Sequence, residues 1–215
     1  MVTDYFSLGS STLIPVSADD GRNRPRVVTR HSGKTAGGDV SAALKWLNPV
    51  VTYMVVGDMT LALNLGTAFA AATGCTGYMI TTVTVSTAVR RFPTVTVSAV
   101  ANEGANAINL FPVSIPLLGR ARAQNLLGVV SGGGEIQSSQ LTAICDPVVC
   151  AEDLIPCASD VVNGRYELTA QTLATAGQSE PTVAPASGFV GTAENTGTYP
   201  VERTRYRITA RKDIY

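Results

Sequence analysis

Two identical segments with alternating valine and hydroxylic residues form the most regular pattern in the chain. The sequence Thr-Val-Thr-Val-Ser occupies residues 82–86 and returns at 94–98. Alternation with a period of two is typical of a strand with one buried face, and Val and Thr both favour strands. The residues between the copies include Arg90, Arg91 and Pro93, which suit a turn. We therefore predict a β-hairpin whose valines face the core and whose threonines face the other side.

The valines also predict the register of this hairpin. Directly opposed residues of an antiparallel pair share a face. The valines align when Val85 pairs with Val95 and Val83 pairs with Val97, which centres the turn on Arg90. Such a register requires an odd-numbered connection, of about three or five residues by the usual hairpin preferences.

Similar alternation, interrupted by glycine and proline, predicts further strands along the chain. With the hairpin they are expected over about 12–16, 26–29, 50–56, 59–65, 78–101, 107–116, 163–173 and 199–210. One short helix is expected over 39–47, because Asp39 can cap it and Pro49 ends it. Many short strands and at most one short helix predict an all-β fold, an antiparallel β-sandwich or barrel.

Composition changes along the chain predict its domain organisation. Residues 1–38 are rich in Gly, Ser, Arg and Asp, and we expect an extended N-terminal arm there, followed by a single β-rich domain over 39–215. Long loops are expected at about 119–160 and 174–198. Segments poor in large apolar residues bury too little apolar surface within one chain to offset the conformational entropy that is lost when they become ordered. We therefore expect neighbouring subunits to hold the arm and the second loop in place.

Low charge suggests that part of the surface is covered by other copies of the chain. Charged residues make up 15% of the sequence, against roughly a quarter in typical domains. Sixteen Lys and Arg balance 16 Asp and Glu, so the formal net charge is zero, and the solubility that net charge provides is missing. A weakly charged monomer is the alternative interpretation.

No apolar stretch reaches the length of a membrane-spanning helix. The apolar runs over 50–56 and 61–72 are shorter or interrupted, whereas a spanning helix needs about twenty residues. We therefore expect no membrane insertion. Residues 1–6 lack the basic region and apolar core of a secretory signal, which predicts synthesis inside a cell.

Candidate catalytic and cofactor chemistry is sparse. The single histidine, His31, has a polar context and no nucleophile at a useful spacing, so we expect it at the surface or at an interface. Residues 32–35 read Ser-Gly-Lys-Thr, similar to the end of a phosphate-binding loop, but Val28 stands where that motif needs glycine. We therefore expect no enzyme activity and no cofactor.

Three of the four cysteines lie in one acidic segment, and Cys75 stands apart. The spacings of Cys145, Cys150 and Cys157 do not match the Cys-x2-Cys pattern of structural zinc sites. We expect no metal site there and prefer a surface loop with buried thiols, a cation site being the alternative. Thiols inside a cell stay reduced. After release from the cell, pairing of Cys145 with Cys150 or with Cys157 stays open.

Arginine recurs at every second position of the last predicted strand. Arg203, Arg205 and Arg207 share a face, as does Arg211. Such a ladder either contacts phosphate or an acidic protein surface or is a solvated face balanced by nearby carboxylates. Zero net charge and the absence of interleaved aromatic residues argue against nucleic acid, so we expect no sequence-specific nucleic-acid binding. We prefer a seam between subunits.

An acidic segment provides the candidate counterpart of this arginine ladder. It contains Asp146, Glu152 and Asp153, with no basic residue from 143 to 160. These residues and the three arginines are our candidates for a subunit interface. The sequence itself contains no catalytic constellation that competes with this interpretation.

The run from Tyr78 to Ser86, with Arg90 to Ala99 after it, resembles the paired strands of bacteriophage structural proteins, tail-tube subunits in particular. The resemblance implies a small β-sandwich or barrel that closes into rings, usually hexameric, which stack into a tube through arms and loops. It implies no catalytic residue.

We therefore expect a self-assembling structural subunit of a virion or phage-like particle, in first place a ring-forming tail-tube protein. Its partners would be copies of itself and other virion proteins, and assembly would take place in the host cytoplasm. The alternatives are a capsid or decoration protein, and a secreted adhesive or carbohydrate-binding β-sandwich with Trp46, Tyr53 or Tyr199 as aromatic platforms.

Overall fold

The computed structural model describes most of the second half of the chain and several shorter segments before it. The described residues are 13–19, 50–61, 65–66, 78–101, 113–115, 123–152, 155–199 and 203–214. Within them the chain is all-β and antiparallel, and the predicted fold class is confirmed. The helix expected over 39–47 lies outside the described residues, as do 1–12 and the strand expected at 26–29.

The described strands range from two-residue pairs to the long hairpin of β8 and β9. They are β1 (Leu13–Asp19), β2 (Val50–Val55), β3 (Met59–Leu61), β4 (Tyr78–Ala88), β5 (Thr94–Ala101), β6 (Val113–Ile115), β7 (Val130–Ser131), β8 (Glu135–Glu152), β9 (Ile155–Thr175), β10 (Thr182–Val183), β11 (Val190–Tyr199) and β12 (Arg203–Asp213). Two short 3-10 helices, η3 (Leu126–Gly128) and η4 (Pro185–Ser187), lie between strands.

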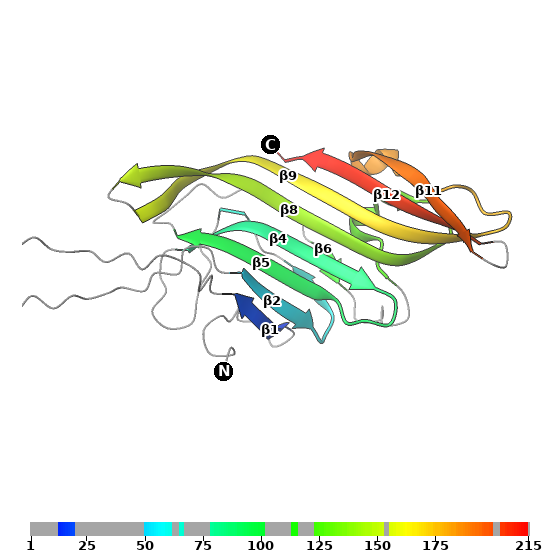
Figure 1. Ribbon diagram of the computed structural model, residues 1–215, viewed down its shortest axis with the longest axis horizontal. Coiled ribbons are helices and arrows are strands. Elements are labelled where there is room, and N and C mark those ends of the chain that lie inside the picture. Colours follow the sequence, from blue (N-terminus) through cyan, green and yellow to red (C-terminus); the bar gives the residue numbers. More distant parts are fainter. Residues whose placement is uncertain are drawn as a thin grey trace, which may run out of the picture.

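Eight of these strands form one twisted sheet (Figure 1). Its order is β1-β2-β5-β4-β8-β9-β12-β11, and every neighbouring pair is antiparallel. Two small sheets, β3-β6 and β7-β10, complete the described strands. No pairing among the described residues joins β1 to β11, so the large sheet is open and these two strands are its edges.

The hairpin of β4 and β5 adopts the predicted register. Val85 pairs with Val95 and Val83 pairs with Val97, and all four side chains are buried. The connection covers residues 89–93, and Arg90 lies in it with a φ of 61°. The prediction from the two identical segments is therefore confirmed in both register and burial.

One face of the large sheet builds the core. Its valines pack with apolar side chains of η3, β3, β7 and the segment before β11, including Leu61, Leu126, Val130 and Phe189. Along β8, β9 and β12 the same face contributes Leu141, Leu168 and Ile208. Burial of apolar area at about 25 cal/mol per Å² therefore holds the small segments against the sheet.

The opposite face of the sheet carries a row of threonines across four strands. Thr52, Thr96, Thr84 and Thr142 are register neighbours on β2, β5, β4 and β8. The Oγ1 atoms of Thr52 and Thr96 lie 3.0 Å apart, and those of Thr84 and Thr142 lie 3.2 Å apart. Each hydroxyl can donate to its neighbour, so these half-buried side chains satisfy one another across the strands.

The two expected long loops are largely strand, and this part of the sequence prediction was wrong. Within 119–160, residues 135–152 form β8 and residues 155–160 begin β9. Within 174–198, residues 190–198 lie in β11, which pairs with β12 of the same chain. In β8 and β9, buried side chains such as Leu141 and Ala143 add to the backbone pairing. In β11 the side chains are exposed, and backbone pairing with β12 orders the strand. The strand expected at about 12–16 within the arm is present as β1, which pairs with β2.

Candidate assembly surfaces

The arginines of β12 lie on one face, as their spacing predicts. Arg203 and Arg207 are exposed and Arg205 is half-buried, whereas Tyr206 and Ile208 on the other face of the strand are buried. The strand thus anchors its apolar side in the core and presents a basic side to the surface. Whether that side forms a subunit seam stays a prediction.

Beside these arginines, a cluster of charges near the end of β12 neutralises itself. Arg211 pairs with Asp213, at 2.9 Å between Nη2 and Oδ1. Arg165 donates from Nε to Glu167 Oε1 at 2.8 Å, and its Nη1 lies 3.8 Å from Asp146 Oδ1. The hydrogen bond to Glu167 is the main reason that the pKa of Arg165 is raised. Arg165, Glu167, Arg211 and Asp213 therefore have ion-pair partners within the chain.

The residues directly opposite the other three arginines are mostly uncharged. Glu194 is directly opposite Arg207, but the residues directly opposite Arg203 and Arg205 are uncharged. Arg203 pairs across the strands with Thr175 and Tyr199, and Arg205 pairs with Leu173 and Gly197.

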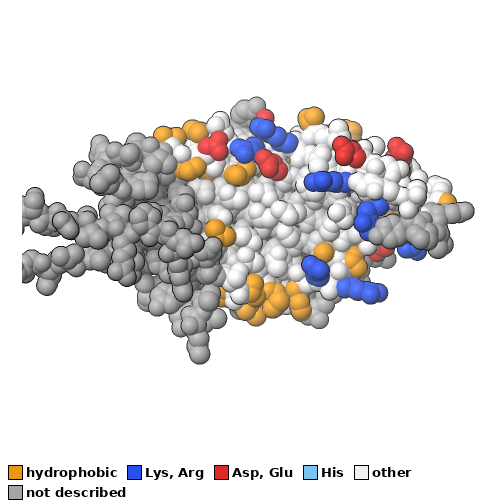
Figure 2. Space-filling model, in the orientation of Figure 1, with side chains coloured by type: hydrophobic (Ala, Val, Ile, Leu, Met, Phe, Trp, Pro, Cys, Tyr) orange, Lys and Arg blue, Asp and Glu red, His pale blue; other side chains and the backbone are white. Residues whose placement is uncertain are grey.

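A second basic element lies at the same end of the sheet. Ala88, Ser138, Gln171 and Arg207 are register neighbours, so the exposed turn with Arg90 and Arg91 projects from that end too. Most Lys and Arg side chains in Figure 2 lie over this half of the molecule. We call Arg90, Arg91, Arg203, Arg205 and Arg207 the basic end.

The predicted acidic counterpart lies at the opposite end of the strands. Asp146 is exposed and accepts a hydrogen bond from Asn163 Nδ2 at 3.0 Å. Glu152 ends β8, and Asp153 lies outside the described residues. Between Arg165 and Thr175, β9 rises roughly 30 Å at about 3.4 Å per residue. The structure therefore does not bring the arginines and these acidic residues together within one chain.

Asp146 and Glu152 belong to an extension of the sheet that we call the β8–β9 arm. The last β8 residue that pairs with β4 is Ile144, and the β9 residue nearest the tip that pairs with β12 is Arg165. Beyond these points, residues 145–152 and 155–164 pair only with each other among the described strands. Figure 1 shows this two-stranded arm extending past the neighbouring strands.

Both edge strands expose apolar or uncharged positions. On β1, Ile14 is 42% exposed and Val16 is 52% exposed, and on β11, Val190 is 81% exposed. All side chains described on β11 are exposed, and Glu194 is the one charged residue in that strand. An exposed edge with few charges is a template for pairing with another chain. Composition did not reveal that these strands are edges, because it placed β1 in an arm and β11 in a loop.

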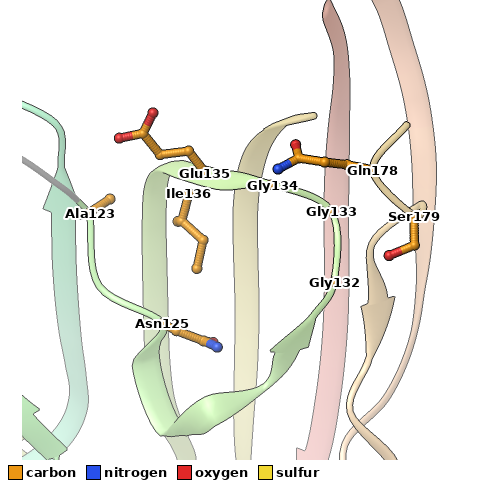
Figure 3. A pocket seen from close by; sticks show the side chains of 9 residues that line it. All are labelled: Ala123, Asn125, Gly132, Gly133, Gly134, Glu135, Ile136, Gln178 and Ser179. Atoms are coloured by element: carbon orange, nitrogen blue, oxygen red, sulfur yellow. The ribbon is translucent and has the colours of Figure 1, made fainter. Parts of the chain in front are cut away.

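A hollow lies beside the glycine-rich turn (Figure 3). Its lining is Ala123, Asn125, Gly132, Gly133, Gly134, Glu135, Ile136, Gln178 and Ser179. Asn125 binds both backbone groups of Val130, at 2.8 and 3.0 Å, and Gln178 Oε1 accepts from the Thr175 amide at 2.8 Å. The amides are thus committed to the turn, and Glu135 is the one ionisable side chain in the lining.

Other candidate chemistry is limited in the part of the chain that the structure describes. There, no group of three or more His, Cys, Asp and Glu side chains is placed to hold a metal ion, and no helix is long and apolar enough to cross a membrane. Tyr53 is fully buried, so it is not an aromatic platform for a sugar. His31 and Trp46 lie outside the described residues, and the side chain of Tyr199 is not described.

A scan against protein-family models, a search of curated proteins and a search of solved structures each found no match to the chain. The resemblance of the β4–β5 hairpin to bacteriophage structural proteins therefore stays an expectation. The features of the described residues that bear on function are the two edges and the two charged ends of the sheet.

Proposed function

We propose that this protein is a self-assembling structural subunit of a virion or phage-like particle, in which copies close into rings through the edges of the large sheet. The open eight-stranded sheet carries this proposal, because among the described strands β1 and β11 each pair on one side only. A ring-forming tail-tube subunit fits best, assembled in the host cytoplasm with copies of itself and other virion proteins.

Pairing β11 of one copy with β1 of the next is a head-to-tail contact. Such contacts generate rings when the rotation closes. The pairing would satisfy the free backbone groups of both edges and cover Ile14, Val16 and Val190, whose exposure is unfavourable in a monomer.

The charged ends of the sheet support stacking of such rings. The basic end and the acidic β8–β9 arm lie at opposite ends of the strands. Copies stacked along the strand direction would bring the Arg203 end of one ring toward the Asp146 end of the next. Complementary charges of this kind set register and increase the association rate more than the final affinity.

Edge variants test the ring by sedimentation velocity. Lysine on an edge strand discourages pairing with another chain, so Thr192→Lys on β11 and Val16→Lys on β1 should each shift the protein from assemblies to monomer. Gln140→Lys is the matched control, since Gln140 and Thr192 belong to the same row across the outer face. Gln140 lies on β8 inside the sheet, and its variant should assemble like the parent. Equal assembly of the edge variants and the control contradicts the proposal.

A further inference from the structure

Two cysteines are directly opposed near the tip of the β8–β9 arm. The register of β8 and β9 pairs Cys150 with Cys157, next to the pair of Ala151 and Pro156. Directly opposed α-carbons of an antiparallel pair lie about 4.5–5.5 Å apart, and those of a disulfide lie about 4.4–6.8 Å apart. The backbone therefore holds these two residues within the range of a disulfide without a shift of either strand.

We propose that Cys150 and Cys157 form a disulfide that closes the tip of the β8–β9 arm under oxidising conditions. The inference rests on the register alone and does not depend on the proposed function. It replaces both pairings that the sequence left open, since each of those involved Cys145.

Cys145 is unsuited to compete for either partner. Its side chain is 3% exposed, and its Sγ donates to the backbone oxygen of Thr81 at 3.5 Å. The register of β8 and β9 shifts between Ile144 and Asp146, and no residue of β9 is directly opposite Cys145. Burial, with a smaller contribution from Asp146, raises the pKa of this thiol to about 11. Because the thiolate is the reactive form, Cys145 reacts slowly at neutral pH.

A disulfide has a clear physical use at this place. The arm is a two-stranded ribbon, and an isolated ribbon of this kind is marginally stable in water. A covalent link between its strands restricts the unfolded chain and favours the paired form. The link would also keep Glu152, at the end of β8, in a fixed position.

Formation of the Cys150–Cys157 disulfide requires an oxidant, and a small-molecule disulfide such as oxidised glutathione can serve. The thiolate of one cysteine attacks the oxidant, which forms a mixed disulfide and releases one glutathione thiolate. The thiolate of the second cysteine then attacks the mixed disulfide at the protein sulfur, and a second glutathione thiolate leaves. The two cysteines lose two electrons and two protons, and the oxidant takes up both electrons.

Peptide mapping of the full-length protein tests the pairing. The dilute, reduced protein is oxidised with oxidised glutathione under native conditions, and the remaining thiols are alkylated in urea. A protease that cleaves before aspartate cuts at Asp58, Asp146, Asp153 and Asp160. It places Cys150 and Cys157 in separate short peptides, and Cys75 and Cys145 together in peptide 58–145. The expected product is peptide 146–152 linked to peptide 153–159, with both cysteines of peptide 58–145 alkylated. Alkylated Cys150 and Cys157, or a link from either of them to peptide 58–145, overturns the proposal.

Oxidation in concentrated urea is the control for this experiment. It shows which disulfides form when the cysteines are close in sequence but the strands are not paired. The unfolded chain has no strand register, and all three cysteines are close in sequence, so links that include Cys145 should form beside the Cys150–Cys157 link. Under native conditions the Cys150–Cys157 link should dominate, and it should persist in Cys145→Ser. An equally dominant Cys150–Cys157 link in urea, or its loss in Cys145→Ser, contradicts the role of the register.

Discussion

At the residue scale, adjacent residues of β4 lie on opposite faces of the sheet, one buried and apolar and the other half-buried and polar. Matched substitutions at two adjacent residues test this difference. Val85 is 2% exposed, whereas Thr84 is half-buried on the other face and contacts Thr142 across the strands. Val85→Asp places a charge in the apolar layer and should lower the free energy of unfolding by roughly 3–5 kcal/mol.

Thr84→Asp is the matched control for this variant, because it introduces the same group one residue away. Its carboxylate can reach water, and the lost contact with Thr142 should cost about 1 kcal/mol. Both values come from urea unfolding of the two variants and the parent. Equal losses would mean that β4 does not separate an apolar face from a polar one.

The buried thiol of Cys145 predicts a specific pH dependence. Its pKa is raised from 9.0 to about 11 in the folded protein, so the folded state keeps the proton that the unfolded state loses. The thiol leaves the free energy of unfolding unchanged below pH 9, and it lowers this free energy as the pH rises from 9 toward 11. Compared with Cys145→Ala, the parent should lose roughly 2–3 kcal/mol more over this window. Parallel pH profiles of the two proteins would show that the thiol is not buried.

At the scale of elements, the turn between β7 and β8 depends on the close packing of Gly133 against Pro181. A β-carbon on Gly133 would lie 2.2 Å from Pro181 Cβ, whereas one on Gly177 would meet nothing within 4 Å. Both glycines have positive φ, 72° and 84°, so alanine strains the backbone similarly at each. Gly177→Ala should therefore cost about 1 kcal/mol, and Gly133→Ala should cost a further 1–3 kcal/mol, roughly, from crowding. Thermal unfolding of the pair measures the difference, and equal midpoints would contradict this packing.

Elements differed in how far the sequence predicted them. The β4–β5 hairpin was predictable to the residue, because valine alternation encodes both its buried face and its register. β11 was not, because hydroxyl and glycine residues dominate it and backbone pairing supplies its order. β8 was not, because small or polar residues such as Ser139 and Ala143 on its buried face weaken the apolar alternation. Arg203, Arg205 and Arg207 were placed on the correct face by parity alone. Their distance from Asp146 was not predictable, since it depends on β8 and β9 extending past their neighbours.

At the scale of the whole molecule, opposite charges at the two ends of the sheet should make assembly sensitive to salt. Replacing Arg203, Arg205 and Arg207 together by Glu should weaken assembly and leave the β-rich circular dichroism of the monomer unchanged. Replacing the same three residues by Lys keeps the charge and should preserve assembly. Salt should weaken association of the parent, because exposed charges are screened over about 10 Å at 0.1 M. Equal assembly of the Glu and Lys variants would remove the basic end from the interface.

The central claim is that copies of this chain associate through its open sheet. Sedimentation velocity of the parent protein over a wide concentration series, in low and in high salt, tests this most directly. We predict discrete assemblies much larger than the 22.4 kDa chain, which grow with concentration and diminish in high salt. A single species of monomer mass at every concentration and at both salt levels would contradict the claim and would favour the adhesive β-sandwich instead.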